Sequence, residues 1–253
     1  MTGSREPQAS QLSHPHAFAV ELRLQRFGRR PVQAIPDPIV EPLWSGARVL
    51  AAIGGEARMF HEGREIIVRD DVRAALAGAI DAAGAILEGH LTAEAFATGE
   101  GTYLEGEKDQ RRPLGMIAQA LMPGSSRRDR FIRDAEQASA ERARELATIE
   151  AAEAGEPLAF VATDLLWLDG EPLFDVPLLE RKRILDATLR ESTLVRRTAY
   201  VRPSAASSLV AWRSLGFTML ALKGANSRYV PGEPNHEWAT VPAPTTIAAS
   251  PFR

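Results

Sequence analysis

The hydrophobic positions of the chain fall into short runs, which glycine, proline and charged residues separate. Residues 49–53, 57–60 and 66–68 are three such runs. Gly54-Gly55 lies between the first two, and a Gly-Gly pair in this place is typical of a β-hairpin. We therefore predict three successive antiparallel strands here.

Apolar runs of strand length recur further along the chain. They cover residues 85–91, 199–201, 219–222 and 238–241. The most apolar run covers residues 158–168, and Asp169-Gly170 follows it with a dipeptide that favours a turn. We predict that this run is a central, buried strand.

Four segments favour helix. They are residues 71–83, 128–153, 177–185 and a segment that ends at Ser214. Asp70 or Asp71 would cap the alanine-rich first helix, and Ser204 or Ser207 would cap the last. The second segment has few apolar positions and no glycine or proline, so we expect a mostly solvated helix.

Two segments lack a clear hydrophobic period. Pro31, Pro36 and Pro38 favour extended backbone over helix in the segment before residue 40. Residues 97–127 are rich in glycine, arginine and proline, so we predict a loop there.

These elements predict one domain over residues 17–242. Residues 1–16 are expected to be a disordered lead, and residues 243–253 a frayed tail. Residues 97–157 are expected to form a helical insert. Because strands do not alternate regularly with helices, the pattern favours an α+β fold over a doubly wound parallel sheet.

Composition adds limits on the kind of protein. The net charge is −3, so no overall basic field attracts nucleic acid. The absence of cysteine excludes disulfides and thiolate metal sites. No apolar run approaches the ~18 residues that a membrane span needs, and the N-terminus lacks an apolar signal core. We expect a cytoplasmic protein with no membrane contact.

One stretch carries a resemblance to a known family. Its sequence is Glu41-Pro42-Leu43-Trp44-Ser45-Gly46-Ala47-Arg48. It resembles the active-site signature of ATP-dependent DNA ligases, in which Lys-x-Asp-Gly-x-Arg follows a short acidic lead. The frame of the signature is present, but Leu43 stands at the position of the nucleophilic lysine and Ser45 at that of the aspartate.

Further matches follow in the order that the family shows, and together they cover roughly residues 36–242. They are His61-Glu62-Gly63-Arg64-Glu65, Glu88-Gly89-His90-Leu91, Ala162 to Gly170 with Pro177 to Arg181, Leu215 to Lys223, and Arg228 to Gly232 with His236-Glu237-Trp238. The similarity is closest to the bacterial end-joining ligases. It implies the ligase-type nucleotidyltransferase fold, which is ATP-grasp-like, with mixed antiparallel sheets and flanking helices.

The resemblance also implies ATP and magnesium as cofactors, and here the catalytic positions depart from the family. In the family a lysine amine attacks the α-phosphate of ATP, which Leu43 cannot do. His90 replaces a glutamate that contacts ribose, Thr163 an aromatic that stacks on adenine, and Thr218 a glutamate that holds metal. The lysines that close the family's last motif are absent after Trp238. We therefore expect ATP binding to be weak or lost.

The residues that match the family are interpreted as remnants of a nucleotide pocket. They are Glu41, Trp44, Gly46, Arg48, Arg64, Glu88, Asp164 and Lys223. Several have a plain structural alternative. Leu43 and Trp44 favour core packing over a ligand pocket, Lys223 could bind phosphate or sit in a salt bridge, and a pair between Arg48 and Glu88 competes with phosphate binding.

The remaining histidine, lysine and arginine candidates are weaker indications of function. The histidines show no metal-ligand spacing, so no metal site is expected and His90 is given no ligand role. Lys108, one of only three lysines, lacks the glycine and arginine context of a substitute nucleophile. The arginine groups at 111–112, 127–133 and 196–197 could touch a DNA backbone, but they lie among acidic residues and favour a solvated face.

Two classes of function follow. The first is a catalytically degenerate ligase-like protein that binds DNA ends or a repair protein. The second is an active nucleotidyltransferase that uses a different nucleophile or a partner chain. The family carries an oligonucleotide-binding barrel after its closing motif, and we expect none here because the chain ends about a dozen residues later.

Overall fold

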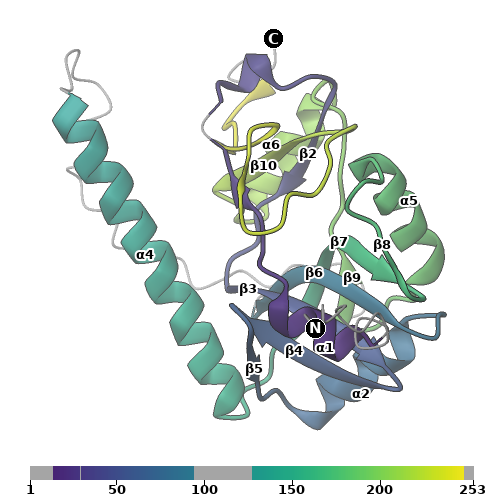
Figure 1. The fold of residues 1–253 in the computed structure, drawn as a ribbon. Helices are drawn as coiled ribbons and strands as arrows, with labels where there is room; N and C mark the ends of the chain where they lie inside the picture. The colour runs from purple at the N-terminus through teal and green to yellow at the C-terminus, as the bar shows by residue number, and fades with distance from the viewer. Residues whose placement is uncertain (1–13, 29, 94–126, 248–253) are drawn as a thin grey trace, which may run out of the picture.

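The computed structural model describes residues 14–28, 30–93 and 127–247, and in the helix that begins at Arg127 it describes side chains from residue 139 onward (Figure 1). Two mainly antiparallel sheets lie one above the other, and helices pack around them. The prediction of an α+β fold is confirmed.

The larger sheet has seven strands in the order β5-β4-β3-β6-β7-β8, with β9 beside β7. Its strands are β3 (Ala47–Gly54), β4 (Glu56–His61), β5 (Arg64–Ile66), β6 (Ala85–Thr92), β7 (Ala159–Leu168), β8 (Glu171–Pro172) and β9 (Val195–Arg197). The predicted hairpin after the signature is confirmed, since β3 pairs antiparallel with β4 around Gly54 and Glu56. The run predicted as a central strand is β7, whose residues 159–167 are all buried.

The smaller sheet has the order β12-β10-β2 and is antiparallel throughout. Its strands are β2 (Pro38–Pro42), β10 (Met219–Gly224) and β12 (Trp238–Pro242). A separate pair, β1 (Arg26–Phe27) and β11 (Pro234–Asn235), lies beside it and is parallel. Because β2 leads directly into β3, the signature stretch crosses from one sheet to the other.

The helices flank these sheets. They are α1 (Pro15–Glu21), the short 3-10 helix η1 (Val32–Ala34), α2 (Asp70–Ala79), α4 (Arg127–Glu153), α5 (Leu178–Thr188) and α6 (Ala206–Ser214). Among the described side chains of helix α4, Ile149 and Ala152, near its C-terminal end, are buried against the body (Figure 1). The expectation of a mostly solvated helix is confirmed for its described side chains, since most residues from 139 to 147 are exposed.

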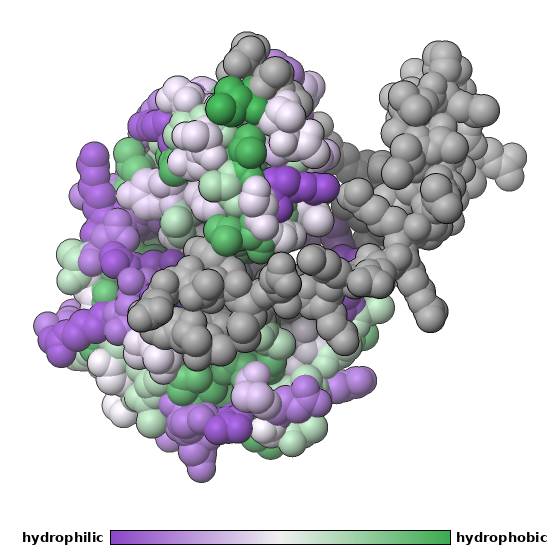
Figure 2. Space-filling view, turned by 180° about the vertical axis from the view of Figure 1, so that it is seen from behind, coloured by the Kyte–Doolittle hydropathy of each residue, from purple (hydrophilic) through white to green (hydrophobic). Residues whose placement is uncertain are grey.

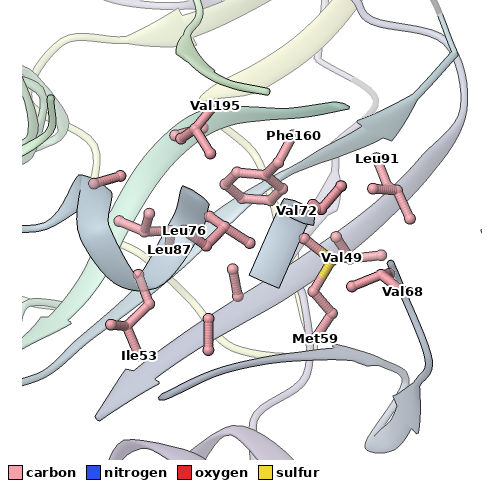
Figure 3. Close-up of a cluster of buried hydrophobic side chains, with 14 of the residues drawn as sticks. Val49, Ile53, Met59, Val68, Val72, Leu76, Leu87, Leu91, Phe160 and Val195 are labelled. Carbon is pink, nitrogen blue, oxygen red and sulfur yellow. The ribbon is translucent and has the colours of Figure 1, made fainter. Parts of the chain in front are cut away.

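Strand alternation divides the core into layers. Val49, Ala51 and Ile53 point to a cluster with Val72 and Leu76 of α2, which Figure 3 shows together with Leu87 and Phe160. The intervening residues of β3 point to the opposite face, as the two-residue period of a strand requires. That opposite face packs on the smaller sheet in a second cluster, which includes Leu50, Ile86, Leu166, Ile39 and Trp238. The space between the sheets is therefore filled, and the signature residues lie at its edge.

The surface seen from behind shows no dominant apolar patch outside the grey residues (Figure 2). Hydrophobic residues there are divided among several areas, with hydrophilic residues around them. A large contiguous apolar patch would mark an interaction surface. That described face does not suggest one.

Some predicted details are wrong near the N-terminus. No helix was predicted before residue 70, yet α1 forms ahead of the proline-rich segment, because Pro15 is tolerated in a first turn and the His14 side chain accepts a hydrogen bond from the His16 amide. Pro15 and His16, expected in the disordered lead, belong to this helix. At the other end Ala243, expected in a frayed tail, is buried and donates its N–H to the Thr218 carbonyl at 2.9 Å.

Other corrections concern helix caps and one strand. Helix α2 ends at Ala79 rather than residue 83, and neither Asp70 nor Asp71 is its N-cap, since Arg69 takes that place. Helix α6 likewise has Ala205 rather than a serine at its N-cap. Residues 199–201 form only an isolated bridge at Val201, because β9 pairs with β7 earlier in the chain. The predicted loop at 97–127 lies outside the described residues, apart from Arg127.

The backbone at Gly46 lies close to the Leu91 carbonyl of β6, so a substitution there tests the conformation of the signature stretch. Gly46 has φ +94°, and a Cβ there would lie 2.2 Å from the Leu91 carbonyl oxygen. Gly55 has a similar φ, +83°, with nothing within 4 Å of its Cβ position. Gly46→Ala should therefore lower the free energy of unfolding by about 1–3 kcal/mol more than Gly55→Ala, because only the first adds a backbone clash to the strain. Equal losses in urea unfolding would contradict this.

Candidate functional site

The centre of the candidate site is a carboxylate shared by two lysines. Glu41 of β2 lies 2.5 Å from Lys182 Nζ of α5 and 2.9 Å from Lys223 Nζ of β10. The Lys182 contact is electrostatic rather than a well-aligned hydrogen bond. All three side chains are buried, and the Lys223 ammonium also lies 4.1 Å from the centre of the Trp238 ring. One carboxylate between two ammonium groups leaves a net positive charge in the interior.

This arrangement sets the ionisation of its members. Burial raises the pKa of Glu41, but the two ammonium groups more than offset it, so the pKa lies below the ordinary value. Burial lowers the pKa of Lys182, and nearby Lys223 lowers it further, while Glu41 opposes both. Glu41 is therefore held as a carboxylate.

A second buried pair lies next to the first. Arg181 donates to both oxygens of Asp164, with Nε to Oδ1 at 2.9 Å and Nη2 to Oδ2 at 2.7 Å. Neither side chain is exposed. Burial raises the pKa of Asp164, but Arg181 and the two lysines hold it below the ordinary value. This two-bond geometry joins the centre of β7 to α5 and leaves the carboxylate fully engaged.

A third pair confirms the structural alternative for Arg48. Its Nη2 donates to Glu88 Oε1 at 2.6 Å, and its Nη1 donates to the Gln25 carbonyl at 2.7 Å. Tyr229 donates its hydroxyl to the other oxygen of Glu88 at 2.7 Å. Both carboxylate oxygens of Glu88 are thus occupied by groups of this chain.

His90 lies on the same face of the sheet as Glu88. It is 8% exposed, and its Nδ1 has no hydrogen-bond partner within the described residues. Burial lowers the pKa of His90 to about 3, and the nearby cations Arg48 and Lys223 add to the effect. The imidazole is therefore neutral at physiological pH and supplies no charge at the position where the resemblance places a glutamate.

The signature stretch itself is used for packing and backbone contacts. Trp44 is buried against Phe217 and donates its Nε1 to Thr198 Oγ1 at 3.0 Å, so the core-packing alternative is confirmed for this residue. Leu43 is half-buried and donates its amide to the Met219 carbonyl at 3.1 Å. Ser45 and Thr218 are exposed.

The structure brings most of the predicted residues together but leaves one apart. Glu41, Arg48, Glu88, Asp164 and Lys223 lie between the two sheets. Arg64 lies on the edge strand β5, where it is 59% exposed and pairs with Glu153 of α4 at 2.7 Å. Arg197, from the last arginine group, pairs with Asp186 at 2.8 Å. Lys108 and the arginines at 111–112 lie outside the described ranges.

The residues present do not fit the cofactors that the resemblance implies. Within the ranges that the structure describes, no group of three or more histidine, cysteine or acidic side chains could hold a metal ion. The lysines that could meet phosphate are both paired with Glu41, and Thr163 offers no ring to adenine but donates to the Glu88 carbonyl at 3.2 Å. We derive no step through ATP or magnesium at this site.

Sequence reasoning missed Arg181 and Lys182 as members of the cluster. Their signal is the spacing Leu178, Arg181, Lys182, Leu185, which puts all four on one side of a helix with both leucines buried. Two cations on an apolar helical face require buried partners. The partner of Arg181, Asp164, lies 17 residues earlier in the chain, whereas the partner of Lys182, Glu41, is brought to it only by long-range packing.

This fold is the one that DNA-ligase domains have. The ligase domain of LigD from M. tuberculosis superposes with a TM-score of 0.52 at 18% identity, over 87% of this chain and 59% of that one. A mycobacterial DNA ligase D complexed with ATP and MES gives 0.52 at 17% identity, over 87% and 60%. The described residues therefore have the ligase-type nucleotidyltransferase fold, and the chain spans about 60% of the length of these neighbours.

The likeness rests on structure alone. No protein-family model matches the sequence. A search of curated proteins found no match either. Along the described part of the chain, no helix has both the length and the apolar character needed to cross a membrane.

The buried pair of Asp164 and Arg181 should make a large contribution to stability. Asp164→Asn leaves the Arg181 charge buried without its partner and should cost about 3–5 kcal/mol in the free energy of unfolding. Asp81→Asn is the matched control, because its pair with Arg190 is more than 70% exposed on both sides and should contribute little. Chemical unfolding of the three proteins at pH 7 measures both effects, and similar losses would count against a buried network.

His90 should make stability depend on pH. The pKa of His90 in the folded chain, about 3, is below its ordinary value of 6.5. Below pH 6.5 the unfolded chain therefore binds a proton that the folded chain does not, so the free energy of unfolding falls as the pH falls from 6.5 towards 3. The loss should be about 2 kcal/mol at pH 5. Urea unfolding of the wild type and His90→Gln between pH 7 and pH 5 measures it.

The comparison of the wild type with His90→Gln isolates this group, because both proteins keep the other titrating side chains. Glu41 and Asp164 also have lowered pKa values, but they lose stability only as the pH falls below their ordinary values of 4.5 and 3.8. His16, whose pKa burial also lowers, adds a drop of the same sign that the variant keeps. If His90→Gln and the wild type lose the same free energy of unfolding between pH 7 and pH 5, the inference that the buried His90 imidazole is neutral is wrong.

Proposed function

We propose that this chain is a DNA-ligase-fold protein that does not adenylate itself and that acts as a binding protein, or pseudoenzyme, in DNA repair or end joining. The observation that carries the proposal is Leu43 at the position of the nucleophile, beside a cluster of charged side chains that pair with one another. Its expected partners are DNA ends or a repair protein.

The pairing pattern supports this proposal. In an adenylating enzyme, cations and carboxylates face the phosphates and the metal, where charge develops in the transition state. Here Glu41 pairs with Lys182 and Lys223, Asp164 with Arg181, and Glu88 with Arg48. Polar groups that the resemblance assigns to the pocket thus serve to join the two sheets and α5.

One observation favours the alternative, an active nucleotidyltransferase with another nucleophile. The pKa of Lys182 is lowered by burial and by nearby Lys223, and such a lysine has more of the neutral amine that attacks an electrophile. Against it, the side chain is 2% exposed and its ammonium is in contact with Glu41. The pseudoenzyme is therefore the better supported function.

We expect no covalent AMP on the wild-type chain after incubation with labelled ATP and magnesium or manganese. Leu43→Lys alone should not restore it, because Ser45 and Thr218 supply no carboxylates and positioning worth up to ~7–11 kcal/mol would still be missing. That variant should instead lose about 1–3 kcal/mol of stability at this half-buried position. Denaturing electrophoresis and urea unfolding measure these two effects.

Matched variants separate the two functions. Leu43→Lys with Ser45→Asp and Thr218→Glu tests whether the frame can still support adenylation. A label on the wild type that is stable to denaturation, and that disappears in Lys182→Met, Lys223→Ala or Lys108→Ala, would establish the alternative. Calorimetry gives a second readout, since ATP affinity in the micromolar range, about −8 kcal/mol, would also oppose the proposal.

A further inference from the structure

A cavity lies outside the closed charge cluster, between α4 and the body of the protein. Its volume is about 510 Å³, within the range of small-molecule pockets. Three pieces of chain form its walls: the segment 22–26 that rises from α1 towards the smaller sheet, the ends of β3 and β4, and Glu145 of α4 (Figure 1). Nothing in the proposed function uses this cavity.

One wall of the cavity is cationic. Arg23 and Arg26 come from the rising segment, and both are exposed. Arg23 uses Nη1 to donate to the Val20 and Leu22 carbonyls, which fixes the guanidinium beside the cavity. The nearest carboxylate to Arg26 is Glu233, at 3.9 Å and with both side chains about two-thirds exposed, so this pair is weak. Arg26 is therefore available to an incoming anion.

Two acidic side chains also line the cavity. Glu62 follows β4 and is exposed, next to Gly63 and the Arg23 guanidinium, and Glu145 reaches the cavity from α4. Burial raises the pKa of Glu145, although the nearby His61, a hydrogen bond from the Arg48 backbone and the Arg48 guanidinium oppose this. His61 itself is in contact with the Arg48 carbonyl through Nδ1 at 3.1 Å. A desolvated carboxylate beside a second acidic residue gains most from a cationic partner.

The floor of the cavity is apolar. Leu22, Leu50 and Phe60 are buried beneath it. An apolar chain that lies over these side chains is removed from water, which favours binding.

We propose that this cavity binds a dipolar ligand whose carboxylate and ammonium groups are separated by an apolar chain. The carboxylate faces Arg26, the apolar chain lies over the leucines and Phe60, and the ammonium faces Glu145. Two sources share this chemistry: a free ω-amino acid, and the C-terminus of a protein that ends in lysine. The proposal is independent of whether the chain adenylates itself.

The test uses three small probes on the full chain. ε-Aminocaproate carries both charges, whereas caproate and hexylamine carry one each on the same apolar chain. Since a charge-assisted contact is worth about 1.5–3 kcal/mol, ε-aminocaproate should bind at least about ten-fold more tightly than either analogue. Protein-observed NMR titration measures all three. Equal affinities, or no binding of ε-aminocaproate, would overturn the proposal.

Matched variants locate the binding. Glu145→Gln and Arg26→Gln should each lower the affinity for ε-aminocaproate towards that of a one-charge analogue. Glu150→Gln on the exposed side of α4, and Arg30→Gln beyond the cavity, should leave it unchanged. A loss that is the same in the control variants would place the ligand elsewhere. Unfolding midpoints of all four variants confirm that they are folded.

Two peptides distinguish the sources. A short peptide that ends in lysine with a free carboxylate should bind at least as tightly as ε-aminocaproate, and its amidated form should not, if the ligand is a protein C-terminus. If the free amino acid binds and neither peptide does, the ligand is a small molecule. Binding of both peptides alike would show that the carboxylate is not recognised, which contradicts the proposal.

Discussion

The ion pairs of Glu41 constrain the rest of the structure more than any other contact. Moving a carboxylate and two ammonium groups out of water costs several kcal/mol per ion, and only close pairing offsets that cost. The three side chains come from β2, α5 and β10, so the charges can pair only when the smaller sheet and α5 are both in place. Removal of Glu41 leaves two ammonium groups in the interior without a carboxylate, whereas removal of either lysine leaves a one-to-one pair. The three charged side chains can therefore be buried only when β2, α5 and β10 are correctly assembled.

The same constraint bears on the proposed loss of ligase-like chemistry. A nucleotide pocket needs polar groups that are held in place yet left free for the ligand. In this chain the groups are held by one another, through Glu41 with its lysines, Asp164 with Arg181, and Glu88 with Arg48 and Tyr229. The side chains that match a family of enzymes therefore act here as internal links between layers.

Much of the fold follows from local pattern, because strands such as β7 have continuous apolar runs with turn residues at their ends. The pairing of Arg48 with Glu88 was among the alternatives, since both lie on strands of one sheet. The shared role of Lys182 and Lys223 was not predictable, because residues 41, 182 and 223 meet only through long-range packing. Helix α1 was missed for a different reason: at seven residues it depends on the His14 cap and on buried Ala19 rather than on a periodic pattern.

The shallow attachment of α4 has a mechanical consequence. With Ile149 and Ala152 as its buried contacts, the helix extends about 33 Å beyond Ile149 towards its N-terminus. A rotation of the helix about these buried contacts moves each residue in proportion to its distance from Ile149. A rotation of about 10° there moves the far end by about 6 Å, while Glu145, close to Ile149, moves by only about 1 Å. The packing of these two side chains therefore limits how far the N-terminal end of α4 moves.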